Sequence, residues 1–139
     1  MKKNHKVLWI DDDVNGPELM SERNSLEEAN CSITPITTPD ELIYVDDPSK
    51  FDCVIVDLSM PTGKKLTLQQ TRGGSRTGLC ILKELKKEHP EIKAVVYTVF
   101  DISEVKEFCQ KQGIKYLNKS DYLADDFADA IVKLINDVI

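Results

Sequence analysis

Short apolar runs alternate with stretches of helical periodicity along the whole chain. Five of these runs read as strands, and they occupy residues 6–10, 31–36, 52–58, 93–98 and 114–118. The third run, Cys-Val-Ile-Val, is uninterrupted, as in a strand buried on both faces of a sheet. Strands that alternate with helices are typical of a parallel sheet with helices on both sides. The sequence therefore predicts an α/β fold.

Helix signals fill the gaps between the strands. Helices are expected at about residues 16–30, 38–45, 78–89, 101–113 and 123–138. Thr38 with Glu41 and Asp101 with Glu104 form two capping-box signatures. Gly113 stands where a helix commonly ends. Five strands and five helices predict one doubly wound parallel sheet in the flavodoxin-like strand order 2-1-3-4-5.

Size and composition limit the classes of protein. The chain has 139 residues, which suits one domain over 1–139. Its net charge of -6 argues against direct nucleic-acid binding. No apolar stretch has the length of a signal peptide or a membrane span, so we expect no membrane partner and a cytoplasmic location. The four cysteines lack Cys-x-x-Cys spacing, and Cys53 and Cys80 are expected to be buried in a reducing compartment.

Polar residues stand at the ends of four of the predicted strands. Asp11 and Asp12 follow the first, Asp57 follows the third, Thr98 ends the fourth and Lys119 follows the fifth. Ligands of open parallel sheets bind beyond the carboxyl ends of the strands, where such residues converge. The sequence therefore predicts one pocket containing acids, a hydroxyl and an amine.

This pocket is suited to a divalent cation and a phosphoryl group. Carboxylates held close together repel each other unless a cation is present. Mg²⁺ accepts a few carboxylates and takes a phosphate oxygen as a further ligand. An Asp57 oxygen could then attack phosphorus in line. Lys119 could pair with that carboxylate, and the Thr98 hydroxyl could hydrogen-bond a phosphoryl oxygen.

Four motifs in this order carry a family resemblance. The motifs are Trp9-Ile10-Asp11-Asp12-Asp13, Val54-Ile55-Val56-Asp57-Leu58-Ser59-Met60-Pro61, Val95-Val96-Tyr97-Thr98-Val99 and Tyr116-Leu117-Asn118-Lys119. Over essentially its whole length the chain resembles the receiver domain of two-component response regulators, the CheY-like superfamily. Each motif alone is weak, but four in order at strand ends are specific.

The resemblance implies roles for the site residues. Asp57 would accept a phosphoryl group from the histidine of a sensor kinase or of a histidine phosphotransfer protein. Asp11, Asp12, Asp57 and the backbone carbonyl of Ser59 would hold Mg²⁺, and Lys119 would contact the phosphoryl group. Such a domain modifies only itself, by phosphorylation and dephosphorylation, and turns over no free substrate.

The resemblance also implies a switch. Thr98 would move towards the phosphoryl group and Tyr116 would rotate inward, which changes a surface read by a downstream protein target or output domain. Ser59 and Phe100 lie where such domains tune the lifetime of the phosphoaspartate. Because the chain ends just after the last predicted helix, we expect either a stand-alone regulator or a receiver excised from a longer protein.

The chain departs from the family pattern in two places. Ser120 follows Lys119, where the family usually has proline. Residues 62–77 form an insertion between Met-Pro and the glycine matched to Gly78, and they contain two lysines, two arginines and no acid. The interpretation without a specific function is that these basic residues belong to a solvated, flexible loop. The alternatives are a cover for the site, a partner surface or an effect on dephosphorylation.

Two other functions compete with the phosphoacceptor. A pseudo-receiver would bind a partner without phosphorylation. A phosphatase resembling the haloacid dehalogenases would use Asp11 as nucleophile and Asp13 as acid/base, with Asp125 and Asp126 completing the set. The phosphatase leaves Asp57 without a role, and Asp125-Asp126 lies in the opening of an amphipathic helix.

Overall fold

The computed structural model describes residues 4–64 and 66–137. Lys65 of the insertion and Val138 of the last predicted helix lie outside these residues. The strands are β1 His5–Ile10, β2 Cys31–Ile36, β3 Cys53–Val56, β4 Ala94–Thr98 and β5 Lys115–Asn118. All pair in parallel in the order β2-β1-β3-β4-β5, which confirms the predicted sheet.

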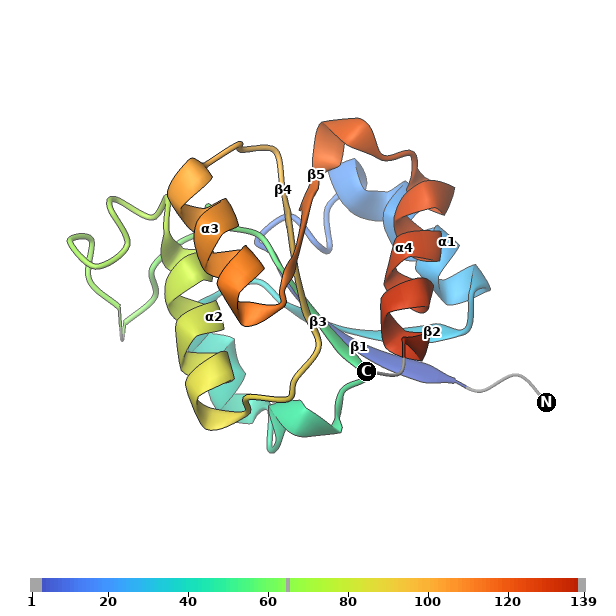
Figure 1. Cartoon of the computed structure of the whole chain (residues 1–139), viewed down its shortest axis with the longest axis horizontal. Coiled ribbons are helices and arrows are strands. Elements are labelled where there is room, and N and C mark those ends of the chain that lie inside the picture. Colours follow the sequence, from blue (N-terminus) through green and yellow to red (C-terminus); the bar gives the residue numbers. More distant parts are fainter. Residues whose placement is uncertain (1–3, 65, 138–139) are drawn as a thin grey trace.

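The helices cover both faces of this sheet, with α1 and α4 on one side and α2 and α3 on the other (Figure 1). The α-helices are α1 Met20–Glu28, α2 Thr77–Glu88, α3 Ser103–Gln112 and α4 Ala124–Asn136. The second predicted helix is a short 3-10 helix, Pro39–Tyr44. Its start is as predicted, because the Glu41 carboxylate accepts a hydrogen bond from the backbone of Thr38, 3.1 Å away.

Each face of the sheet has its own apolar core. Alternate residues of β1 divide between the two faces, so Leu8 packs with α2 and α3 while Trp9 packs with α1 and α4. Trp9 is fully buried, and its ring centroid lies 5.3 Å from that of Phe127. Tyr97 stacks on Phe127 at 4.0 Å. These aromatic rings lie beneath the carboxyl ends of β1 and β4.

One predicted cap is wrong. Helix α3 has no side-chain cap, and its N-cap position is Ile102. Asp101 forms an ion pair with Lys106 instead, and Glu104 forms ion pairs with Arg72 and Arg76 of the segment 62–77. At the other end of α3, Gly113 adopts the left-handed conformation with φ of 69°, which confirms the predicted C-terminal glycine.

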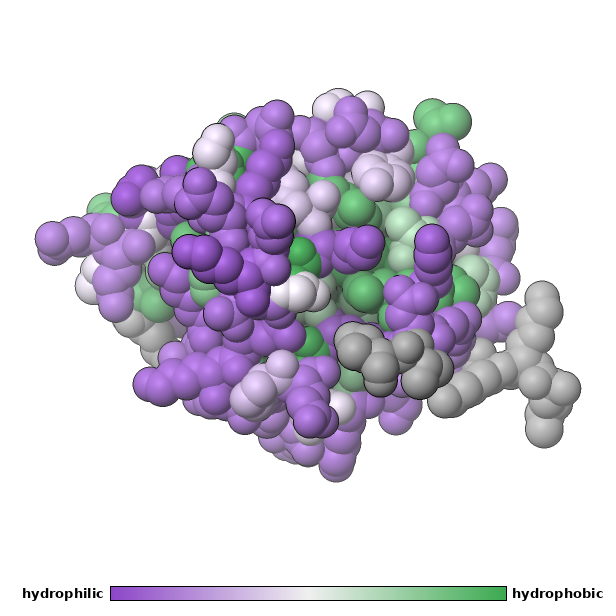
Figure 2. All heavy atoms as spheres, in the orientation of Figure 1, coloured by the Kyte–Doolittle hydropathy of each residue, from purple (hydrophilic) through white to green (hydrophobic). Residues whose placement is uncertain are grey.

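The cysteines are free thiols, and three of them, Cys31, Cys53 and Cys109, are buried. Cys80 is partly exposed, so its expected burial is wrong: it lies on the side of α2 that faces the segment 62–77, where its sulfur is 3.6 Å from the Gln70 carbonyl oxygen. Hydrophilic residues cover most of the face shown in Figure 2. Within residues 4–64 and 66–137, no helix has the length and apolarity to cross a membrane.

Candidate functional site

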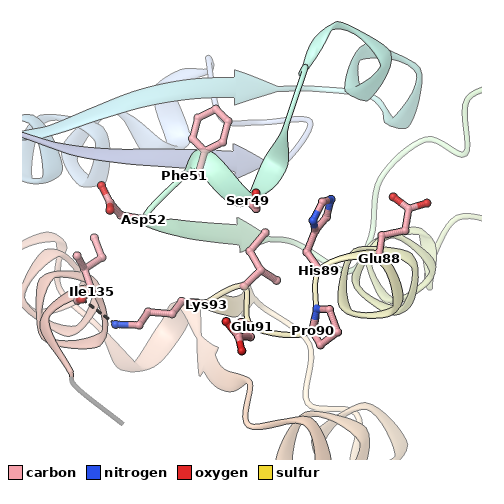
Figure 3. Close-up of a pocket in the computed structure, with 10 residues that line it drawn as sticks. Ser49, Phe51, Asp52, Glu88, His89, Pro90, Glu91, Lys93 and Ile135 are labelled. Carbon is pink, nitrogen blue, oxygen red and sulfur yellow. Dashed lines mark hydrogen bonds between the residues drawn. The ribbon is translucent and has the colours of Figure 1, made fainter.

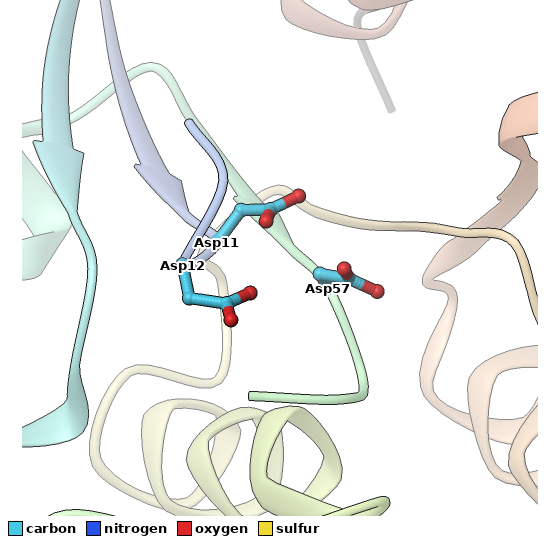
Figure 4. A group of neighbouring side chains, drawn as sticks. All are labelled: Asp11, Asp12 and Asp57. Atoms are coloured by element: carbon cyan, nitrogen blue, oxygen red, sulfur yellow. The ribbon is translucent and has the colours of Figure 1, made fainter. Parts of the chain in front are cut away.

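Three carboxylates meet at the carboxyl edge of the sheet (Figure 4). Strands β1 and β3 are neighbours, with Ile10 opposite Val56, so the residues that follow them emerge side by side. The backbone N–H of Asp57 donates to the Ile10 carbonyl at 2.9 Å. One oxygen from each of Asp11, Asp12 and Asp57 lies within 4.8 Å of the other two.

Lys119 joins this cluster from the far side of β4. Its Nζ lies 2.8 Å from Asp11 Oδ2 and 3.1 Å from Asp57 Oδ2. Asp11 is fully buried and Asp57 is 6% exposed, so the ammonium group bridges two carboxylates that water barely reaches. Of the predicted site residues, the structure thus brings together Asp11, Asp12, Asp57 and Lys119.

The charges in this cluster perturb one another. Burial raises the pKa of Asp11 to about 6, the charge of Asp57 adds to the rise, and Lys119 opposes it. Burial also raises the pKa of Asp12, with further contributions from Asp13 and Asp57. For Lys119, burial lowers the pKa, but the carboxylates of Asp57 and Asp11 outweigh it and the net direction is up. The cluster therefore has more negative charge than Lys119 alone compensates.

The donor set fits a hard divalent cation. Mg²⁺ binds oxygen ligands at about 2.0–2.1 Å in an octahedron, so neighbouring ligand oxygens are about 2.9 Å apart and opposite ones about 4.2 Å apart. The three carboxylates, whose oxygens lie within 4.8 Å of one another, would draw closer together around such an ion. Ser59, whose carbonyl was expected to be a further ligand, lines the same hollow as Asp12. These residues could hold the ion, and a cation there would relieve the repulsion between them.

The two expected switch residues, Thr98 at the end of β4 and Tyr116 in β5, both contact the β4–α3 connection. Thr98 is fully buried at the end of β4, and its hydroxyl accepts a 3.4 Å hydrogen bond from the backbone N–H of Phe100. The Tyr116 hydroxyl donates to the Phe100 carbonyl at 2.6 Å and accepts from the Ile102 N–H at 3.4 Å. Thr98 and Tyr116 therefore both hydrogen-bond the loop between β4 and α3. Thr98 does so from the buried end of β4, and Tyr116 from the edge strand β5.

The backbone of Gly78 packs directly against the backbone of Asp57. A Cβ atom on Gly78 would lie 1.9 Å from the Asp57 carbonyl oxygen, so only glycine fits at this crossing. The Gly78 N–H also donates to the Leu58 carbonyl at 3.0 Å. The sequence marked this residue only as a match to the family pattern. A glycine in the first turn of a predicted helix is the signal that could have indicated this close backbone contact.

The segment 62–77 is folded onto the site. Thr67 and Gln70 bond each other's backbone N–H groups, each at 3.0 Å, and the Gly73 N–H donates to the Leu68 carbonyl at 2.7 Å. Thr71, within this turn, is fully buried. Most described residues of the segment are exposed or partly exposed, including the basic residues Lys64 and Arg72, as in a solvated loop, but the turn around Thr71 is held by its own hydrogen bonds. No long-range periodicity reveals such a turn, because local side-chain to backbone bonds build it.

A hollow of about 420 Å³ separates the segment 62–77 from the acidic cluster. Its lining comes from the site on one side and from the segment on the other, and comprises Asp12, Ser59, Met60, Pro61, Thr62, Leu68, Gly73 and Gly74. The insertion is thus a wall of the candidate site.

Ser120, the other departure from the family pattern, has a local role. Its backbone N–H donates to the Asn118 side chain at 2.9 Å, and its hydroxyl bonds the same oxygen. A proline at this position has no N–H and could not make the first bond. The hydrogen bonds hold the short 3-10 helix Lys119–Asp121, which carries the site lysine.

The residues of the phosphatase alternative do not assemble. Asp13 is exposed, and it contacts Asp11 only through its backbone N–H, at 2.9 Å. Asp125 lies in the first turn of α4, where it accepts a hydrogen bond from Ser25 at 2.7 Å. The third carboxylate that the structure brings to Asp11 and Asp12 is that of Asp57.

A second hollow lies at the opposite edge of the sheet (Figure 3). It has a volume of about 640 Å³ and is lined by residues that precede β3 and β4, among them Asp52, His89 and Lys93. The Lys93 ammonium donates a hydrogen bond to the Ile135 carbonyl at 2.8 Å. This hollow is at the amino ends of the strands, away from the acidic cluster.

Comparison with known proteins identifies the fold. No family model matches the chain, and no curated protein does. Among solved structures, the non-phosphorylated HemR receiver domain from Leptospira biflexa matches with a TM-score of 0.74 and 18% identity over 98% of both chains. A response regulator receiver domain protein from Clostridium thermocellum matches with a TM-score of 0.70 and 27% identity over 95% of this chain and 94% of that one. A CheY-like receiver domain protein from Methanospirillum hungatei JF-1 gives a TM-score of 0.72 at 19% identity, over 96% and 95%.

These neighbours cover nearly the whole chain, and they are receiver domains of response regulators. The chain has the fold of a response-regulator receiver domain, as the motif resemblance predicted. In this fold the acidic cluster of Asp11, Asp12 and Asp57 lies at the carboxyl edge of the sheet.

Proposed function

We propose that this protein is a phosphoacceptor receiver of a two-component phosphorelay, with Asp57 as the acceptor. One observation carries the proposal: Lys119 Nζ bonds both Asp11 and Asp57, at the point where three carboxylates meet. A lysine that holds two buried carboxylates is poised to transfer one contact to a phosphoryl oxygen.

The transfer makes one bond and breaks one bond. An Asp57 carboxylate oxygen attacks phosphorus, the P–N bond to the donor histidine breaks, and the imidazole leaves with its electron pair. Asp11, Asp12, Asp57 and the Ser59 carbonyl would hold Mg²⁺, which would neutralise charge on the phosphoryl group. Lys119 contacts a phosphoryl oxygen. The acceptor modifies itself, so the protein acts as a signalling domain and not as an enzyme with turnover.

The readout follows from the β4–α3 connection. In the proposed switch, the Thr98 hydroxyl leaves the Phe100 N–H for a phosphoryl oxygen, and Tyr116 gives up its bonds to that loop to turn inward. The surface around α3, β5 and α4 then changes for a downstream protein or output domain. We further propose one receiver domain over 1–139, with an insertion at about 62–77, working in the cytoplasm.

Mass spectrometry of the intact protein tests the acceptor. Wild type, Asp57→Asn and the matched control Asp13→Asn are incubated with acetyl phosphate, with and without Mg²⁺. We expect a single Mg²⁺-dependent phosphoryl adduct in wild type and in the control, and none in Asp57→Asn.

Other outcomes favour the competing functions. Absence of an adduct in wild type supports the pseudo-receiver. Phosphate release that survives in Asp57→Asn and disappears in Asp11→Asn and Asp13→Asn supports the phosphatase. An adduct that persists in Asp57→Asn refutes the assignment of the acceptor.

A further inference from the structure

The segment 62–77 is hydrogen-bonded to the loop Asp57–Met60, which carries the candidate metal ligands Asp57 and Ser59. Met60 directly follows Ser59, and both polar groups of its backbone are bonded to the segment. The Met60 N–H donates to the Gly74 carbonyl at 3.2 Å, and the buried Thr77 hydroxyl donates to the Met60 carbonyl at 2.8 Å. A Cβ on Gly74 would lie 3.1 Å from the Met60 carbonyl oxygen, so the contact is close. The position of the Asp57–Met60 loop therefore depends on this segment.

Thr71 links Gly74 to Arg76 within the segment. Its buried hydroxyl donates to the Thr67 carbonyl at 2.9 Å and accepts from the Gly74 N–H at 3.1 Å. Its carbonyl accepts from the Arg76 N–H at 2.7 Å. Because one buried residue bonds both Gly74 and Arg76, a displacement of Arg76 reaches the residue that holds Met60.

The outer end of the link is fixed to α3. Glu104 Oε1 lies 2.9 Å from Arg76 Nε and 3.0 Å from an Arg72 guanidinium nitrogen. Arg76 is 16% exposed at its side chain, while Arg72 is 63% exposed, so the Arg76 contact is the better shielded of the two. Glu104 belongs to the first turn of α3, the helix that follows Thr98 and its loop.

Two routes therefore connect the site with α3. One runs from the Asp57–Met60 loop through the segment 62–77 to Glu104. The other runs from Thr98, at the end of β4, through the following loop into α3. A shift of α3 therefore changes either the Glu104 pair or the position of Met60.

We propose that Glu104 is a positioning residue for the metal and phosphoryl site, acting through Arg76 and Arg72 on the segment 62–77. It links the position of α3 to the affinity of the Asp11–Asp12–Asp57 cluster for Mg²⁺. This inference rests on the proposed function. By thermodynamic linkage, a partner that moves α3 changes the affinity for Mg²⁺, and Mg²⁺ changes the affinity for that partner by the same factor.

Glu104→Gln tests this link against Glu107→Gln. Glu107 is exposed on the same helix, is absent from the ion pairs of the described residues, and its substitution makes the same change in net charge. We expect Glu104→Gln to weaken Mg²⁺ binding in calorimetry by about two- to fivefold, the range of an exposed ion-pair network. Hydrogen exchange of the Met60 and Gly74 amides should also accelerate without Mg²⁺. Glu107→Gln should change neither.

A second variant separates positioning from a general loss of stability. Arg76→Gln should weaken Mg²⁺ binding by no more than Glu104→Gln does, because it leaves the Arg72–Glu104 pair in place. The double variant should be no worse than Glu104→Gln alone, because that substitution already removes the Arg76 contact. Equal affinities in Glu104→Gln and Glu107→Gln, or fully additive effects of the two substitutions, would overturn the inference. A wild type that binds no Mg²⁺ and forms no Asp57 adduct would instead overturn the proposed function.

Discussion

At the scale of single residues, Asp11 shows the cost of assembling the site. Its side chain is fully buried beside Asp57, and this burial raises its pKa from the ordinary aspartate value of 3.8 to about 6. The folded state therefore binds a proton at Asp11 more tightly than the unfolded chain does. The resulting stabilisation is present below about pH 4 and is lost as the pH rises through about 6. At neutral pH the ionised carboxylate opposes folding.

Asp11→Asn should thus stabilise the metal-free protein at neutral pH. Asparagine has the same shape and keeps an oxygen for the Asp13 N–H, but it carries no charge. We expect the free energy of unfolding at pH 7.5 to rise by about 1–2 kcal/mol, and by less at pH 5. Urea denaturation at both pH values, in the presence of a chelator, measures this. The exposed control Asp13→Asn should change little; an unaltered or lower stability of Asp11→Asn at pH 7.5 would contradict the argument.

At the scale of helices and strands, the sequence predicted a feature correctly where the residues that form it are neighbours in sequence. The Thr38–Glu41 cap formed because its partners are neighbours in sequence. The Asp101–Glu104 cap failed because arginines 28 and 32 residues away took the Glu104 carboxylate. The turn within 62–77 was not predictable either, since it depends on a left-handed backbone at Arg72, Gly73 and Gly74 and on the burial of Thr71.

The start of α2 gives a sharp prediction at this scale. In Gly78→Ala the new methyl group meets the Asp57 carbonyl, so either α2 or the acceptor loop must move. We expect a loss of about 1–3 kcal/mol in the free energy of unfolding, typical of overpacking, and slower phosphorylation. Chemical denaturation and the acetyl phosphate assay provide the two readouts. Glu84→Ala, on the exposed side of the same helix, is the control and should behave as wild type.

At the scale of the whole molecule, topology is what made the site predictable. Polar residues at four strand ends had to converge once the sheet was parallel, and the structure brings Asp11, Asp57 and Lys119 within bonding distance. Topology did not predict which surface residues reach this edge from outside. The link from Glu104 to Met60 combines contacts among residues far apart in sequence, and no local pattern encodes it.

The surplus of negative charge at that edge predicts stabilisation by Mg²⁺. Binding to the folded state alone, at ten times the dissociation constant, adds about 1.4 kcal/mol and raises the melting temperature by about 4 °C. Thermal unfolding with increasing MgCl₂, followed by addition of EDTA, measures the rise and its reversal. Asp57→Asn should reduce the shift, whereas an equal shift in NaCl of the same ionic strength would show that screening alone is responsible.

The aromatic group beneath the site gives the molecule an internal optical reporter. Trp9 is the single tryptophan of the chain; it lies two residues before Asp11 and packs against Phe127, which in turn stacks on Tyr97. Indole emission depends on nearby charges and on packing, so events at the carboxylates should alter it without an added label. Unfolding exposes the same ring to water. One native chromophore can therefore follow ion binding, acyl phosphate formation and folding in the unmodified chain.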